Sequence, residues 1–276
     1  MRRNIFQILS DMEFNPVDEY ARLNQLIFYE KIDGFNSLFN YLDKCVFRHL
    51  PIRGSFLHIG DMLEYIELPE YIEQYTNITT DALFNFCELV FAIIEQGDLY
   101  IDKLGQDVIQ QASSVRHQIL YVLDKANHEF VEDSNGNNII VEKNRTARQA
   151  AETVKDEPVA FRILEYNHFA LLGDLQKKQD VLQAIGTYVE PKLNDKIFTS
   201  TAYKGLADDA RFMLNNFNIR HNNKSGKSAN SFMQSITDSE LEQWYDKTYN
   251  TLLMLIIAEE QVEISNELKD IKSKHF

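Results

Sequence analysis

An arginine, a histidine and two asparagines stand side by side in the stretch FNIRHNNKSGK, residues 217–227. Cleavage of a phosphodiester needs proton transfer, and an imidazole titrates close to neutral pH. A guanidinium can hold a phosphate in fork geometry, and asparagine amides supply neutral donors and acceptors. No carboxylate stands in this stretch, so the chemistry predicted here needs no metal and uses the 2′-hydroxyl of RNA. We assign Arg220 and His221 to catalysis, and Asn222, Asn223, Lys224 and Lys227 to substrate binding.

The same four residues also suit the end of a helix. Basic side chains near a helix C-terminus interact favourably with the negative end of the helix dipole, and asparagine commonly terminates a helix. A polar loop between helices needs no function. The sequence leaves both interpretations open.

Charge is distributed unevenly along this 276-residue chain, whose formal net charge is −14. Residues 1–110 hold 18 Asp and Glu against 8 Lys and Arg, whereas residues 210–237 contain four basic residues and no acidic one. The net charge argues against a general nucleic-acid binder, because phosphates need counter-charge. One basic window in an acidic chain can still bind an anion locally.

Other candidate residues carry less chemistry. His168, in the segment EYNHF, could serve as a second acid–base or substrate-binding group, or could simply cap a helix end. Cys45 and Cys87 lack metal-ligand spacing, and we expect reduced thiols in a cytoplasmic core. No metal or cofactor motif is present in the sequence, and its longest apolar run, residues 252–258, is too short for a membrane span.

Apolar spacing of three and four residues predicts a mainly α protein with two helical domains, residues 1–145 and 146–276. In the first domain we expect helices over 17–32, 35–47, 62–66, 79–96 and 107–125, the fourth closed by Gly97. Two short runs around Asn135-Gly136 predict one β-hairpin at the end of this domain.

The second domain is expected to be a four-helix bundle. Its segments cover 159–172, the stripe following Asp174 up to Val189, 203–217, and a long helix that begins with the capping box Thr237–Glu240. The chain past Ile264 is mostly charged, and we expect it to fray.

Several segments resemble a known family. EYNHFALLGDLQKKQDVLQAI, YVEPKL, LNNFNIRHNNKSG and DSELEQWYDKTYNTLL are similar to the C-terminal part of AbiJ-like abortive-infection proteins, and PIRGSFLHIGDMLEYIEL is similar to the helical domain that precedes it. An arginine followed by a polar residue at a helix end also resembles the HEPN superfamily of helical domains, which includes many RNases. The resemblance extends from about residue 51 to residue 258.

The resemblance implies a cytoplasmic anti-phage effector that cuts RNA at a site shared between the subunits of a homodimer. It also implies an antitoxin or a phage-derived trigger as a regulating partner. The family pattern places a histidine a few residues after the arginine, but Ser225, Gly226 and Lys227 stand there instead. Either His221 transfers the proton, or the domain is a non-catalytic binder of RNA, a nucleotide or a protein.

Overall fold

A computed structural model describes residues 14–32, 34–65, 78–101, 105–133, 135–193, 198 and 203–275, with the backbone alone at 98–101. The chain forms two compact units, Met1–Phe130 and Val131–Phe276. The division therefore falls within the first strand of the hairpin, whereas the sequence places it after the hairpin, at residue 145. The protein is mainly helical, as expected, and no described helix has the length and apolarity that a membrane crossing requires.

The first unit is built from helices that begin within three residues of where the sequence places them. Its α-helices are α2 (Pro16–Asn24), α3 (Leu38–Tyr41), α4 (Ile59–Tyr65), α5 (Thr80–Ile101) and α6 (Gln106–Lys125). Wider π-helical turns over Gln25–Tyr29 and Leu42–Val46 continue α2 and α3, and 3₁₀ turns cover Phe47–His49 and Pro51–Arg53. The end of the expected helix 62–66, Ile66, lies outside the described residues.

Gly97 does not close α5, which continues to Ile101. A Cβ at Gly97 would lie 2.6 Å from a methyl carbon of Val46. The missing side chain therefore lets α5 pack closely against the segment Leu42–Val46. The prediction of a helix end was wrong because glycine serves close approach as well as helix termination.

The hairpin is confirmed, with β1 (His128–Glu132) and β2 (Asn138–Glu142) forming a two-stranded sheet. At the turn, the Asp133 carboxylate accepts hydrogen bonds from the backbone N–H groups of Asn135 and Asn137, both at 2.8 Å. These bonds hold the chain where it reverses direction.

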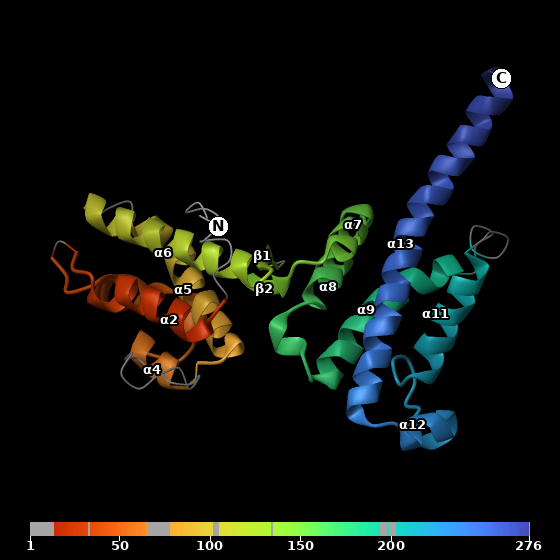
Figure 1. The fold of residues 1–276 in the computed structure, drawn as a ribbon, viewed down its shortest axis with the longest axis horizontal. Helices are drawn as coiled ribbons and strands as arrows, with labels where there is room; N and C mark the ends of the chain where they lie inside the picture. Colours follow the sequence, from red (N-terminus) through yellow and green to blue (C-terminus); the bar gives the residue numbers. More distant parts are fainter. Residues whose placement is uncertain are drawn as a thin grey trace, which may run out of the picture. The chain divides into compact units, whose positions relative to one another are not determined.

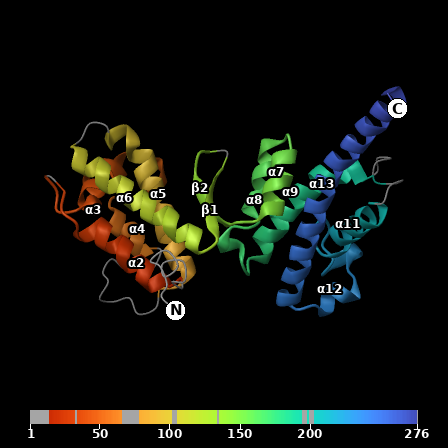
Figure 2. The same ribbon diagram turned by 45° about the horizontal axis from the view of Figure 1, so that its top comes forward.

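The second unit consists of α7 (Arg145–Thr153), α8 (Glu157–Glu165), α9 (Leu175–Leu193), α11 (Lys204–Asn216), α12 (Ser231–Ser235) and α13 (Asp238–His275). Helix α13 packs against α7, α9 and α11, around a core that includes Leu182, Ile185, Leu214 and Leu252 (Figures 1 and 2). The helix expected over 159–172 is shorter, because α8 ends at Glu165 and a 3₁₀ turn follows at Phe169–Leu171.

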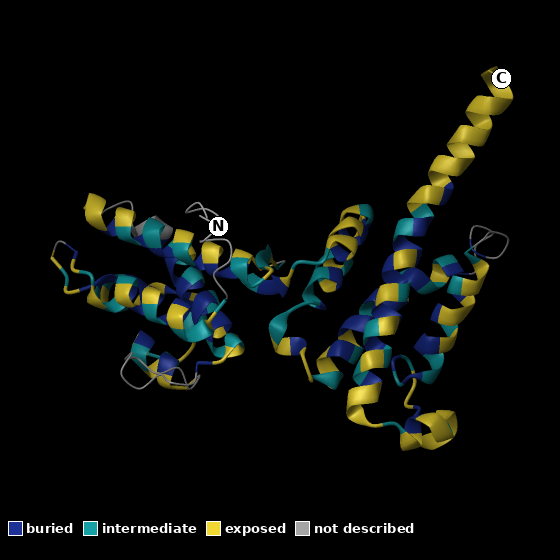
Figure 3. Ribbon diagram, in the orientation of Figure 1, coloured by how far each residue is buried: buried dark blue, intermediate teal, exposed yellow. Residues whose placement is uncertain are grey.

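Helix α13 begins at the expected capping box. The Thr237 hydroxyl accepts from the Glu240 N–H at 3.3 Å, and the Glu240 carboxylate accepts from the Thr237 N–H at 3.0 Å. The helix does not fray past Ile264 but continues to His275, and every residue from 263 to 275 is exposed (Figure 3). Its last turns therefore extend beyond the bundle.

Candidate nucleic-acid interface

The predicted site lies in a loop, Asn218–Lys227, which we call the corner loop. Helix α11 ends at Asn216, and Asn218 turns the chain with a φ of 60°. Asparagine tolerates this left-handed conformation better than other residues with a side chain. Residues 220–223 therefore lie past the end of the helix, which Asn218 terminates, and any ligand chemistry has to be built on this loop.

Asn223 holds the corner loop together. Its side-chain oxygen accepts the Asn218 N–H at 2.8 Å, its backbone N–H donates to the Asn218 side chain at 3.0 Å, and its amide nitrogen donates to the Ser228 carbonyl at 2.9 Å. The residue is 2% exposed. The side chain is buried and bonds to backbone groups of Asn218 and Ser228. It therefore fixes the shape of the loop, although the sequence assigned it to substrate binding.

Arg220 is engaged by the bundle. Its guanidinium forms an ion pair with Glu190 on α9 and lies 3.4 Å from the side-chain oxygen of Asn215. Its side chain is 30% exposed. The ion pair uses one terminal nitrogen of the guanidinium and offsets part of its positive charge, so a phosphate would bind the remaining N–H groups beside the Glu190 carboxylate.

The other predicted site residues of the corner loop face solvent. His221, Asn222, Lys224 and Lys227 are all exposed. The Asn222 side-chain oxygen accepts the N–H groups of Lys224 and Ser225 at 3.2 and 3.0 Å, which leaves its amide N–H groups for another partner. The Lys224 ammonium lies 3.5 Å from Asp238 at the start of α13, so part of its charge is already compensated.

The structure does not bring His168 to this corner. His168 pairs with Val141 of strand β2 and precedes α9, whereas Glu190, the partner of Arg220, lies near the other end of that helix. The rise of an α-helix puts roughly 22 Å between Leu175 and Glu190. His168 instead caps a helical turn, since its ring nitrogen accepts the Ala170 N–H at 3.3 Å.

Four aromatic rings, which the sequence analysis did not single out, lie beside the corner loop. Phe217, immediately before the loop, is 5.9 Å from Phe212, 5.7 Å from Phe232 and 4.8 Å from Trp244, measured between ring centroids. We call these four residues the aromatic cluster. Phe212 and Phe232 are 58% and 44% exposed, and Lys247 lies over the Trp244 ring at 4.2 Å. The cluster therefore presents apolar faces and a cation to solvent.

A cavity of about 290 Å³ adjoins the cluster. It is lined by Phe232, Ser235, Ile236, Glu240, Gln243 and Trp244. A flat ring could stack there against Phe232 or Trp244, with amide and hydroxyl groups at its edge. A hint of this surface in the sequence is Phe212, which stands off the apolar stripe of α11.

The comparisons with known proteins add no relative. No family model, no curated protein and no solved structure matches this chain. The functional argument therefore depends on the geometry of the corner loop and its surroundings.

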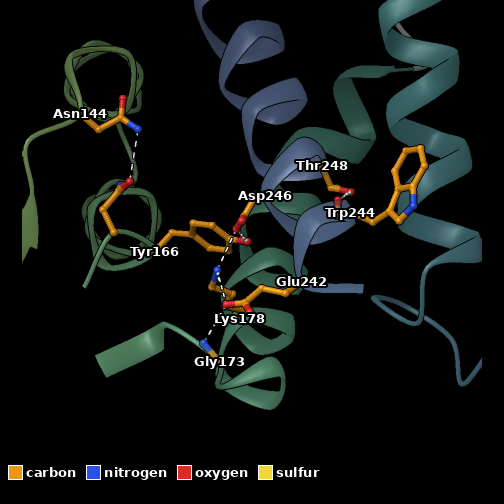
Figure 4. A network of polar contacts seen from close by, with 9 residues as sticks. Asn144, Tyr166, Gly173, Lys178, Glu242, Trp244, Asp246 and Thr248 are labelled. Atoms are coloured by element: carbon orange, nitrogen blue, oxygen red, sulfur yellow. Dashed lines mark hydrogen bonds and ion pairs between the residues drawn. The ribbon is translucent and has the colours of Figure 1, made fainter. Parts of the chain in front are cut away.

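A second polar cluster lies in the same unit, on the face of α13 that points away from the Trp244 ring (Figure 4). The Lys178 ammonium, on a side chain that is 7% exposed, contacts Glu242 at 2.9 Å and Asp246 at 2.8 Å. Tyr166 donates to Asp246 at 2.9 Å, and the Gly173 N–H donates to Glu242 at 2.7 Å. Burial, and then the Asp246 charge, raise the pKa of the Tyr166 hydroxyl well above its ordinary value. These groups satisfy one another, and we interpret the network as structural.

Proposed function

We propose that the second unit binds single-stranded RNA through the corner loop and the aromatic cluster, as the nucleic-acid-binding part of a phage-defence protein. The observation that carries the proposal is the placement of two exposed aromatic rings, Phe212 and Phe232, beside a loop with exposed cations. Stacking of a base on an aromatic side chain stabilises a single-strand complex by about 1–3 kcal/mol. Lysines beside the rings would hold the backbone.

Electrostatics limit the strength of this interaction. Lys224 and Lys227 supply the exposed charge of the corner loop, and Asp238 compensates part of it. For about two phosphates neutralised on a single strand, the slope of log K against log salt is roughly −1.4. The net charge of −14 opposes the approach of RNA to the chain as a whole. Moderate affinity confined to one surface is the consequence.

The choice of RNA, the defence role and the antitoxin or trigger as partner rest on the resemblance to abortive-infection proteins. The acidic first unit suits the regulatory part of that role, because an acidic surface pairs with a basic partner. A nucleotide would use the same rings and lysines, whereas a protein ligand would use the rings alone.

Endonucleolytic cleavage is the second candidate function, and the exposure of His221 favours it. In this mechanism the imidazole moves a proton to or from a ribose or phosphate oxygen. Arg220 stabilises the phosphate through the guanidinium N–H groups that Glu190 does not contact. The Glu190 carboxylate lies close to that phosphate, and its negative charge opposes cleavage more than it opposes binding at the aromatic cluster.

Position 232 offers a matched test of binding. A fluorescent single-stranded RNA, its duplex and its DNA counterpart are titrated with the full chain, and anisotropy is measured at several salt concentrations. Phe232→Tyr keeps the ring and should bind as the wild type does, whereas Phe232→Leu keeps apolar volume without a ring and should lose about tenfold in affinity. Equal affinity of the two variants would refute stacking, and equal binding of DNA would refute selectivity for RNA.

Cleavage is measured with the same RNA and the same protein variants. RNA is incubated with the protein in EDTA, and the products are analysed for 2′,3′-cyclic phosphate ends. Retarded but intact RNA supports the binding function. Cyclic-phosphate products that disappear in His221→Ala would establish the second candidate instead.

A further inference from the structure

The end of helix α13 carries an apolar stripe that its own unit does not cover. Beyond Val262, the last buried residue, every side chain from 263 to 275 is exposed. Figure 3 shows these turns extending past the rest of the second unit. Ile264, Leu268 and Ile271 are 41%, 48% and 49% exposed. A helix of this length, roughly 20 Å beyond the bundle, is marginal in water by itself.

The spacing of the stripe is that of a coiled-coil seam. Apolar or uncharged residues recur at intervals of three and four residues in the order Met254, Ile257, Gln261, Ile264, Leu268, Ile271 and His275. Two helices that meet along such a repeat pack their side chains as knobs into holes. Met254 is 55% exposed and Ile257 half-buried, so the stripe begins while α13 is still part of the bundle.

The charges beside the stripe indicate what covers it. Residues 259–267 contain four glutamates and no basic residue, whereas residues 268–275 contain Lys269, Lys272 and Lys274 with one aspartate. Glu259 is already paired with Lys192 at 2.6 Å, and the other three glutamates are exposed. A second copy running antiparallel places the acidic half of each helix against the basic half of the other. A parallel copy would place like charges together.

We propose that the ends of α13 from two copies of this chain pair as a short antiparallel coiled coil. In the register that this charge pattern favours, Ile264 packs against the partner's Leu268, and Glu260 lies beside the partner's Lys274. The acid-to-base gradient also suits the dipole of a single helix, but that explanation leaves the apolar stripe in water. The coiled coil uses neither the corner loop nor the aromatic cluster, so it stands apart from the RNA-binding proposal.

Sedimentation equilibrium of the full chain between about 1 and 100 μM tests the pairing, because so short a seam supports micromolar association. Leu268→Asp puts a charge in the seam of both copies and should weaken dimerisation about a thousandfold. The matched control Asn266→Asp adds the same charge on the opposite face of the helix and should leave the dimer unchanged. A monomer at every concentration, or a dimer that persists in Leu268→Asp, would overturn the proposal.

Disulfide cross-linking tests the orientation. In a Cys45→Ser background, Glu260→Cys and Lys274→Cys chains are mixed and oxidised. The remaining Cys87 is buried, and burial raises the pKa of its thiol, so it should not react. Antiparallel pairing gives cross-linked dimers in the mixture and little in either variant alone. Cross-linking within each variant alone would show a parallel pair and refute the assignment.

Discussion

Replacement of Lys178 by methionine tests how much the buried ammonium group stabilises the second unit. Methionine keeps most of the aliphatic length of lysine and removes the ammonium group. The Lys178 ammonium links α9 to Glu242 and Asp246 on α13 (Figure 4). In Lys178→Met the two carboxylates remain close together without the cation between them.

The expected loss in free energy of unfolding depends on the solvation and the hydrogen bonds that Glu242 and Asp246 keep in the variant. Removing one partner of a buried ion pair costs about 3–5 kcal/mol. Here the side chains of Glu242 and Asp246 are 20% and 49% exposed, so water solvates part of the charge. Glu242 also keeps the Gly173 N–H, and Asp246 keeps the Tyr166 hydroxyl. We therefore expect Lys178→Met to lower the free energy of unfolding of this unit by about 2 kcal/mol.

The chain supplies its own assay. It contains one tryptophan, Trp244, which lies in the second unit. Urea unfolding followed by its fluorescence reports on that unit, whatever the first unit does. With an m-value of about 2 kcal/mol/M, the midpoint should fall by about 1 M. Lys177→Met is the matched control, because the Lys177 side chain is 63% exposed and its substitution should leave the midpoint unchanged.

The pH dependence gives a second readout. Burial by itself would raise the pKa of Glu242, but the Gly173 N–H and the Lys178 ammonium together hold it below its usual value. In the wild type this carboxylate stabilises the fold above its unfolded pKa, and that contribution is lost as the pH falls through the lower folded pKa. In Lys178→Met the folded pKa rises, so the destabilisation should shrink as the pH falls toward and then through the wild-type folded pKa of Glu242, which lies below 4.5. A penalty independent of pH, or a midpoint equal to that of Lys177→Met, would refute the reasoning.

Two further substitutions test the interior and the loop. Tyr249→Phe removes a buried hydroxyl that donates to the Ile163 carbonyl at 2.6 Å. We expect it to destabilise the second unit by about 1–2 kcal/mol in the same fluorescence experiment, and an unchanged midpoint would contradict this. Asn223→Ala removes the hydrogen bonds of the Asn223 side chain with the Asn218 N–H and the Ser228 carbonyl. We expect trypsin to cleave faster after Lys224, and a cleavage rate equal to that of the wild type would show that this side chain does not hold the loop.

Local features of the fold were predicted correctly because the interactions that produce them lie within a few residues. The capping box Thr237–Glu240 forms as expected, with partners three residues apart. The hairpin around Asn135-Gly136 also forms through local interactions, since Gly136 takes a φ of 81° and Asp133 bonds to the backbone two and four residues further on, whereas Asn135 does not adopt a positive φ. Gly97 was misjudged because its role depends on Val46, far away in the chain.

The sequence by itself determined that the protein is mainly helical, where its longer helices lie, and that four basic residues around residue 220 stand in a window without acidic ones. It missed the short helices α7 and α12. Tertiary structure decided what those cations can do. Arg220 meets Glu190, 30 residues away, and Lys178 meets Asp246, 68 residues away. The same packing brings Phe212, Phe232 and Trp244 from three helices to the ring of Phe217. Contacts between helices depend on how their faces pack, and the spacing of residues within one helix carries no information about the side chain that a neighbouring helix presents.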